Sequence, residues 1–414
     1  MRLPLLLSVF LVTLSFWSSS PCAGFDGEPE VPVLVQNADA ICVVKVVAIT
    51  NVTPTQFEAV HKGRNGMPVF IDAQSAVAEA TVQNVLAGKI GRKSIHISFF
   101  KNVRHGFNPS PFTELAAGET DIVFLKATTD DAHFALSQPT SHGKSKITIG
   151  DAKIGLLPPT ASPLRTVLLV LVDALNGGSK PVELECLNRI GSAGYLLYAK
   201  AGVYVDEGAI ARRLKIGEPL LSDNATSSLE SFVNDQILPS VLKMTTDKDD
   251  KICEQAFLTA GYLQDVKVIP ELVKIANANS KPGEYEEAAE ILGQYRNPEA
   301  VRPLVNALSS KNSYVRQKAA DALRNFADPL AVPFLLDHLD DPDSPADPFP
   351  GAQYYVVTAL YTATNTPGYP GTTLFHDNPG EYIAFWKKWA AEHRDKIKAL
   401  RAQFNAPAPV PAAP

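Results

Sequence analysis

Histidine is the residue type of this chain best suited to bind a metal or to transfer a proton. The eight histidines form neither a His-Glu-x-x-His motif nor a pair at the helical spacing of metal ligands. His96 alternates with Ile95 and Ile97, which is typical of the solvent face of a β-strand, and we favour that interpretation over metal ligation. The histidines therefore predict no metal centre.

The four cysteines are the other candidates for reactive chemistry, and they lack the Cys-x-x-Cys spacing of a zinc ribbon or a redox site. Cys42 lies in an expected strand, and Cys186 and Cys253 lie in expected helices, which indicates buried apolar thiols. The alternative is a disulfide between Cys186 and Cys253, if the chain reaches an oxidising compartment. Spacing alone does not decide between the two.

Motifs of the common enzyme classes are absent from the sequence. It has no Gly-x-Ser-x-Gly nucleophile elbow, no P-loop and no glycine pattern of a dinucleotide site. Two acidic clusters, residues 247–250 and 340–347, could offer oxygen ligands to calcium, but neither has EF-hand spacing. We therefore expect a protein that is not an enzyme and that has no cofactor site and no metal site.

Composition indicates a globular chain that is long enough for more than one domain. It has 414 residues, of which 45% are hydrophobic and 20% are charged. The formal net charge of −6 gives no general attraction to nucleic acid or to an anionic lipid surface. We expect no nucleic-acid partner.

The first residues have the pattern of an export signal. Arg2 precedes an apolar run from Leu3 to Trp17, whose length suits a secretory leader better than a membrane span. We expect cleavage to remove residues 1–24 and the mature protein to be periplasmic or secreted. Cys22 could instead carry the lipid anchor of a bacterial lipoprotein, but Pro21 makes a poor lipobox, and we favour ordinary cleavage. No later apolar stretch has the length of a transmembrane helix.

Residues 25–158 predict a small β-barrel or sandwich, because short stretches rich in β-branched residues alternate with turn residues. The expected strands are residues 40–49, 75–86, 93–100, 120–125 and 133–136.

Three short motifs of this region resemble an OB-like domain, similar to netrin and metalloproteinase-inhibitor modules. They are Ala38-Asp39 at the first strand, a Val-Leu-Ala-Gly turn at residues 85–88, and Gly118-Glu119 before a Val-Phe-Leu strand. We assign Gly118-Glu119 to the fold rather than to a site. The resemblance implies a β domain that could act as an inhibitor or as a ligand-binding module.

Pro158, Pro159 and Pro163 mark a joint after the β domain. Residues 159–250 predict degenerate helical pairs, so a stack of helices would begin near residue 164. The expected helices cover residues 165–175, 182–190, 195–198, 209–215 and 227–242.

Residues 251–365 carry one helical pattern three times and begin it a fourth time. Pro270, Pro303 and Pro333 recur at intervals of 33 and 30 residues. Each unit contains two stretches with apolar residues on one helical stripe, joined by a turn. A unit of this length cannot bury its apolar face alone, so the pattern predicts an α-solenoid of stacked helix pairs.

The third unit resembles the short bacterial form of the HEAT repeat. Val315-Arg316 enters its first helix, alanines pack that helix, and Asp328-Pro329 turns into the second helix. The second unit resembles this repeat well, whereas the first and the fourth match it less, as the ends of a repeat array do. Together with the β domain, the resemblance implies a multidomain α+β fold, in which an OB-like β-barrel precedes an α-solenoid of HEAT-like helix pairs.

Residues 366–405 are expected to close the array, and residues 406–414 to form an alanine- and proline-rich tail. An expected helix from 378 to 390 is similar to the closing helix after HEAT-like arrays in exported bacterial proteins. Its apolar face carries Tyr382, Phe385, Trp386 and Trp389.

These features favour an exported, non-catalytic scaffold that binds a protein partner through its solenoid. Two alternatives stay open: the β domain acts as an inhibitor or ligand-binding module that the solenoid supports, or the chain is a cryptic lyase or hydrolase. The ordinary role of a basic residue at a unit junction is a solvated face or a hydrogen bond to a neighbouring unit. Partner-binding candidates with that position are Arg302, Arg316, Lys318 and Arg324.

Overall fold

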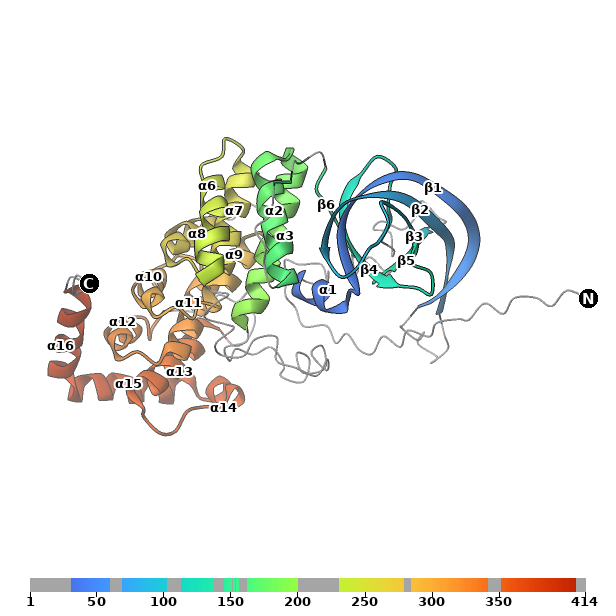
Figure 1. Cartoon of the computed structure of the whole chain (residues 1–414). Helices are drawn as coiled ribbons and strands as arrows, with labels where there is room; N and C mark the ends of the chain where they lie inside the picture. Colours follow the sequence, from blue (N-terminus) through green and yellow to red (C-terminus); the bar gives the residue numbers. More distant parts are fainter. Residues whose placement is uncertain are drawn as a thin grey trace, which may run out of the picture.

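A β-barrel at the N-terminal side and a stack of helices form one elongated body in the computed structural model of this chain (Figure 1). The multidomain α+β class predicted from the sequence is therefore confirmed. The leader, Pro158, Pro159, the helix expected at 209–215 and the tail from Pro407 onward lie outside the described residues. The structure describes residues 31–59, 69–102, 113–137, 145–150, 152, 154–155, 162–199, 231–278, 284–341 and 351–406.

The barrel closes through a ring of five strands in the order β1-β2-β3-β5-β4. β4 pairs back onto β1 from Ala40 opposite Leu125 to Lys45 opposite Thr120, and β3 and β5 run parallel. A short sixth strand pairs with β4. This closed barrel fits the OB-like resemblance. The strands are β1 Ala40–Ala59, β2 Val69–Ala87, β3 Ser94–Asn102, β4 Thr120–Ala127, β5 His133–Leu136 and β6 Lys146–Thr148.

Two elements of this region were not predicted from the sequence. β6 contains only three residues, too few for an alternating pattern. Helix α1, Val31–Asn37, is rich in valine, which favours strands, yet Val31 and Leu34 are fully buried. Packing in the core therefore overrides the local preference of α1.

Strands β1 and β4 are buried on both faces. Cys42 and Val123 face the barrel interior, whereas Ile41 and Phe124 face outward into a second apolar core. Strands covered on both sides have continuous apolar sequences rather than alternating ones. This explains the unbroken β-branched run at the start of β1.

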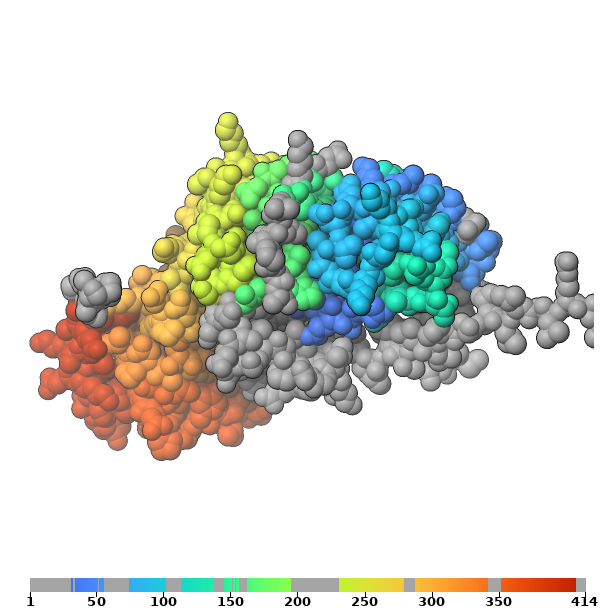
Figure 2. Space-filling model, viewed as in Figure 1, coloured from blue at the N-terminus to red at the C-terminus, as the bar shows by residue number. Residues whose placement is uncertain are grey.

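The outward core of β1, β4 and β6 is shared with α1 and with the first two long helices, α2 Pro163–Gly177 and α3 Lys180–Ala199. In Figure 2, α2 and α3, in green, lie against the barrel, in blue. The backbone N–H of Gly155 also donates to Asp173 of α2 at 2.9 Å. The barrel and the helices are therefore joined by a common core.

The helices form two layers. The second layer consists of the helices that alternate along the chain with those of the first, and each packs on its neighbours in the first layer. The second layer contains α2, α6 Leu238–Met244, α8 Ile269–Asn277, α10 Val301–Ala307 and α12 Val332–Asp337. The first layer, whose members pack on one another in order, contains α3, α7 Asp250–Tyr262, α9 Glu284–Gly293, α11 Ser313–Phe326 and α13 Ala352–Thr364.

Two expected helices have different bounds in the structure. The helix expected near residues 195–198 is the end of α3, which continues without a break to Ala199. The helix expected at 227–242 contains a π-helical turn, Val233–Ile237, before α6. Pro239 lies at the start of α6, where it has no N–H for a regular helical hydrogen bond, and this accounts for the local change of helix type.

Three helices close the C-terminal end: α14 Thr372–Asp377, α15 Pro379–Glu392 and α16 Arg394–Asn405. On α15, Trp386 is fully buried, but Phe385 is 41% exposed. α16 packs on the second layer, where the Phe404 ring lies 4.3 Å from that of Phe334. Within the described residues, no helix combines the length and the apolar content needed to cross a bilayer.

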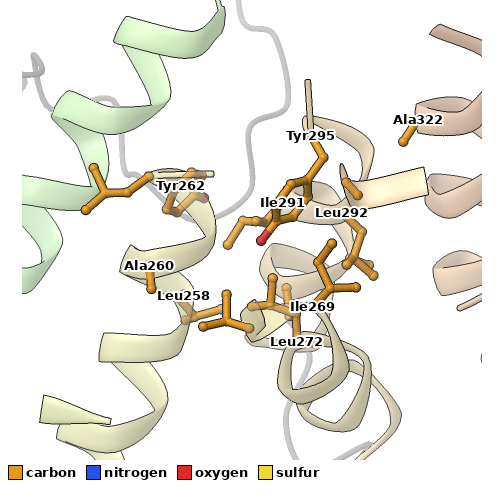
Figure 3. Close-up of a cluster of buried hydrophobic side chains, with 14 of the residues drawn as sticks. Leu258, Ala260, Tyr262, Ile269, Leu272, Ile291, Leu292, Tyr295 and Ala322 are labelled. Atoms are coloured by element: carbon orange, nitrogen blue, oxygen red, sulfur yellow. The ribbon is translucent and has the colours of Figure 1, made fainter. Parts of the chain in front are cut away.

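The interior of the stack is tightly packed where α7, α8 and α9 meet (Figure 3). A Cβ on Gly261 of α7 would lie 2.8 Å from Ile291 Cγ2 and 2.9 Å from Leu272 Cδ1, and both of these side chains are fully buried. The close approach of these helices therefore requires glycine at this position.

We expect Gly261→Ala to lower the free energy of unfolding by about 1–3 kcal/mol, because the added methyl group overpacks the core. Gly177→Ala is the matched control, since a Cβ there would meet nothing within 4 Å. That control should change the free energy by less than about 1 kcal/mol. Urea unfolding followed by circular dichroism measures both, and equal stability of the two variants would contradict the packing argument.

Candidate functional site

Polar side chains fix the start of each second helix in the three clearest repeats. The side chains of Asp265, Asn297 and Asp328 accept hydrogen bonds from the backbone two residues later, at 3.0, 3.0 and 2.8 Å. Each caps a short 3-10 turn that leads into α8, α10 or α12. The capping role that the sequence predicts for Asp328 is thus observed.

Hydrogen bonds between neighbouring repeats set their relative position. Gln264 ends α7 in a left-handed conformation (φ 64°), and its Oε1 accepts from the N–H of Arg296 at 2.7 Å. The buried Tyr295 hydroxyl donates to the carbonyl of Asp265 at 2.8 Å. Because these groups lie at corresponding points of adjacent units, they hold the first layer in register.

The outer face of the first layer carries tyrosines and charged residues that are paired across helices. The Tyr262 hydroxyl on α7 lies 3.2 Å from Glu287 on α9. Lys318 on α11 lies 2.6 Å from Glu290 on α9, which also bonds Tyr314. Such bonds fix the positions of these side chains relative to one another.

The four basic residues chosen from the sequence lie in different places. Lys318 and Arg324 share the outer face of the first layer. Arg316 donates to the carbonyl oxygens of Ser310 (3.0 Å) and Lys311 (3.2 Å) in the loop before its helix.

Arg302 lies on the second layer instead. It donates to the carbonyl of Ala406 at 2.9 Å, and its guanidinium lies 5.3 Å from the centre of the Phe404 ring. All four residues thus bond to partners within the chain, which agrees with the ordinary structural role of basic residues at unit junctions. Their role in binding a partner stays a prediction.

Asp321 is the centre of a charged group at the end of the first layer. Arg324 donates to it at 2.5 Å and to the Tyr369 hydroxyl at 2.9 Å. Burial raises the pKa of Asp321, and the nearby cations Arg324, Lys318 and Arg296 only partly offset this. Burial acts to lower the pKa of Arg324, but Asp321 and Tyr369 outweigh it and raise that pKa.

Arg296 belongs to this charged group but was not selected from the sequence. Its guanidinium donates to the carbonyl of Tyr295 at 3.0 Å, and burial lowers its pKa. The sequence did contain a signal for Arg296. This residue lies directly before Asn297 at a unit junction, which is the position that Gln264 has before Asp265 in the preceding unit. Tyr369 lies in a proline- and glycine-rich loop, where nothing in the sequence predicts a contact with Arg324.

The β-barrel has its own buried titratable group, Asp121. Thr148 donates to its Oδ1 at 2.7 Å, and Lys146 lies 3.9 Å from its Oδ2 while pairing with Glu119 at 2.6 Å. Burial is the main cause that raises the pKa of Asp121 to about 6, and the charge of Lys146 offsets it only in part. These bonds tie β6 to β4 beside the shared core.

His96 and the three cysteines that the structure describes have structural surroundings that account for them. His96 is half-buried rather than fully solvent-facing, because the His133 ring stacks on it at 4.8 Å. Cys42, Cys186 and Cys253 are free thiols, so the alternative disulfide is not formed. Burial raises the pKa of Cys42 and of Cys186 to about 12, which makes both unreactive.

The acidic clusters serve as caps and ion pairs where the structure describes them. Asp249 accepts from the backbone at the start of α7 and pairs with Lys180. Asp341 lies 2.6 Å from His338 and 3.6 Å from Arg316. In the described ranges no three histidine, cysteine or acidic side chains are placed to hold a metal ion.

Residues 280–346, which include the second and third repeats, match the family model of HEAT repeats. The match agrees with the resemblance seen in the second and third units, where Asn297-Pro298 and Asp328-Pro329 open the second helices. The helical region from α2 to α13 is thus a stack of helix pairs, of which residues 280–346 are similar to HEAT repeats.

Two solved structures show weak similarity to the chain. One is an engineered protein of the Northeast Structural Genomics Consortium, with 19% identity over 49% of this chain and 81% of that one, and a TM-score of 0.28. The other is the complex of CpcE and CpcF of phycocyanin lyase from Nostoc sp. PCC7120, with 16% identity over 41% of this chain and 98% of that one, and a TM-score of 0.23. Similarities of this size carry no functional argument, and no curated protein matches the chain significantly.

The pair of Lys318 and Glu290 should contribute to repeat stacking, because both side chains are mostly buried (18% and 27% exposed). A double-mutant cycle with Lys318→Met and Glu290→Gln should give a coupling energy of about 0.5–1.5 kcal/mol in urea unfolding. A coupling energy of zero would show that Lys318 is not held by Glu290.

Asp121 should make stability depend on pH. The folded pKa of Asp121, about 6, lies above the ordinary aspartate value of 3.8. The stability that Asp121 contributes is therefore fully present below pH 3.8 and is lost as the pH rises through 6. We expect Asp121→Asn to remove this slope and to stabilise the protein at pH 8 by on the order of 1–3 kcal/mol.

Asp39→Asn is the control of opposite sign. Lys126 lowers the pKa of Asp39, so this carboxylate stabilises the fold above its unfolded pKa and loses that effect in acid. Urea unfolding at a series of pH values should show the two variants diverging, and parallel profiles would contradict the role assigned to Asp121.

Proposed function

We propose that this protein is an exported, non-catalytic scaffold that binds a protein partner through the outer face of the first layer. The main support is the set of tyrosine and charged side chains that are paired along α7, α9 and α11, together with Tyr369 of the loop that follows α13. Helix pairs in a repeat array provide an extended surface of this kind. HEAT repeats in residues 280–346 are consistent with such a role.

The second layer is the less suitable face. α16 packs on α12 through Phe404, and Arg401 lies 2.9 Å from Asp337. Part of that layer is therefore covered by the chain itself. Export is proposed from the leader pattern of residues 1–24, and the non-catalytic role from the lack of catalytic motifs in the sequence.

Site-specific photo-crosslinking in the full chain tests the proposal. A photoreactive amino acid at Asn325, an exposed residue one turn after Asp321 on α11, should crosslink a defined protein from the extracytoplasmic fraction. The matched control position is Thr81, which is exposed on β2 of the barrel. The full chain is required, because separate halves would expose the core that the barrel shares with α2 and α3.

A crosslink from Asn325 that is absent from Thr81 supports the solenoid as the binding surface. A crosslink from Thr81 alone would favour the alternative, in which the barrel is the binding module. Recovery of the protein only in the cytoplasm, with its leader uncleaved, would contradict the proposed export.

A further inference from the structure

Exposed aromatic side chains gather beside the charged group at the end of the first layer. Tyr369 is 43% exposed and Phe385 is 41% exposed, although both are large apolar residues. The ring of Phe385 stacks on that of Tyr361, with 5.9 Å between the ring centres. The centre of the Tyr361 ring in turn lies 6.4 Å from that of Tyr369. Because Tyr369 bonds Arg324, the aromatic and charged residues are continuous. We call Arg296, Arg324, Tyr369 and Phe385 the end patch.

The end patch has an excess of positive charge. Asp321 is paired with Arg324, and Lys318 with Glu290. Arg296 has one hydrogen-bond acceptor for its guanidinium among the described residues, the carbonyl of Tyr295. Asp321 attracts the Arg296 guanidinium and Arg324 repels it, but Asp321 is already bonded to Arg324, so the three residues together keep a net positive charge. A carboxylate from outside would relieve this repulsion and satisfy the free donors of Arg296.

The composition of the end patch is that of a binding hot spot. Arginine and tyrosine are enriched among the residues that dominate protein interfaces, and aromatic rings supply most of the buried apolar area there. Tyr369 and Phe385 are held by ring contacts with Tyr361, so little side-chain entropy would be lost on binding. Of the other exposed large apolar residues, Val47, Val52 and Val85 lie on the barrel strands, and Leu374 lies on α14.

We propose that the end patch docks a segment of the protein partner in which a carboxylate lies next to an aromatic or aliphatic side chain. The carboxylate binds Arg296 beside Arg324, and the apolar side chain packs on Tyr369 and Phe385. This inference rests on the proposed function, because it names the part of the helical surface that a partner contacts.

The test uses random short peptides displayed on phage and selected on the immobilised full-length protein. Enriched peptides should combine Asp or Glu with Leu, Phe, Tyr or Trp. The best sequences are then synthesised with a free carboxyl end and with an amidated end. Equal binding of the two forms assigns the carboxylate to an acidic side chain, and loss on amidation assigns it to a chain terminus; either result supports the proposal.

Two variants and two matched controls locate the binding site. Arg296→Gln and Phe385→Ser should each weaken the selected peptides by about tenfold or more. Arg92→Gln and Val85→Ser alter an arginine and an exposed valine of the barrel and should leave binding unchanged. Thermal unfolding checks that each variant is folded. If Phe385→Ser is unstable, the peptide affinity of Arg296→Gln alone tests the binding site.

The outcomes separate this inference from the proposed function. Unchanged affinity in Arg296→Gln would overturn the end patch as the docking point while leaving a scaffold that binds elsewhere. Selection of basic peptides would overturn the charge argument. A selection that enriches no sequence from the library would count against both the end patch and the scaffold role.

Discussion

Burial of apolar faces between neighbouring elements is the constraint on which this structure depends. A helix of the stack cannot cover its own apolar stripe, and strands β1 and β4 turn an apolar face toward the outside of their own barrel. Each is covered by its neighbouring elements, from the barrel through α2 and α3 to α13. Stability is therefore distributed along the chain, and the barrel acts as the first member of the stack rather than as an independent module.

Polar bonds add precision to this apolar stacking. Caps at Asp265, Asn297 and Asp328 fix where each second helix begins, and Gln264 ties one unit to the backbone of the next. The same units therefore place Glu290, Lys318 and Asp321 on adjacent helices of one face. The chemistry of that face follows from the register of the repeats, because side chains far apart in sequence meet there only when the units are aligned.

The sequence was most informative where a local pattern and the fold agree. Apolar stripes, the proline intervals and Asp328-Pro329 predicted the repeats, and β-branched runs predicted the five strands of the barrel ring. It failed where packing decides: α1 is helical despite its valines, and β6 is too short to be recognised. Among the basic residues, Arg302 and Arg316 bond backbone carbonyls, whereas Arg296 joins Asp321 and Arg324. Those partners come from other units or from irregular loops, so charge and spacing alone do not reveal them.

Both ends of the helical array are closed by parts of the same chain. The barrel covers α2 and α3, and the C-terminal helices cover the last repeat, with Trp386 buried against Tyr361. An array with open ends could add copies of itself end to end and grow into a filament. Closure at both ends covers the apolar surfaces that such growth would use, so the described fold limits the length of its own array.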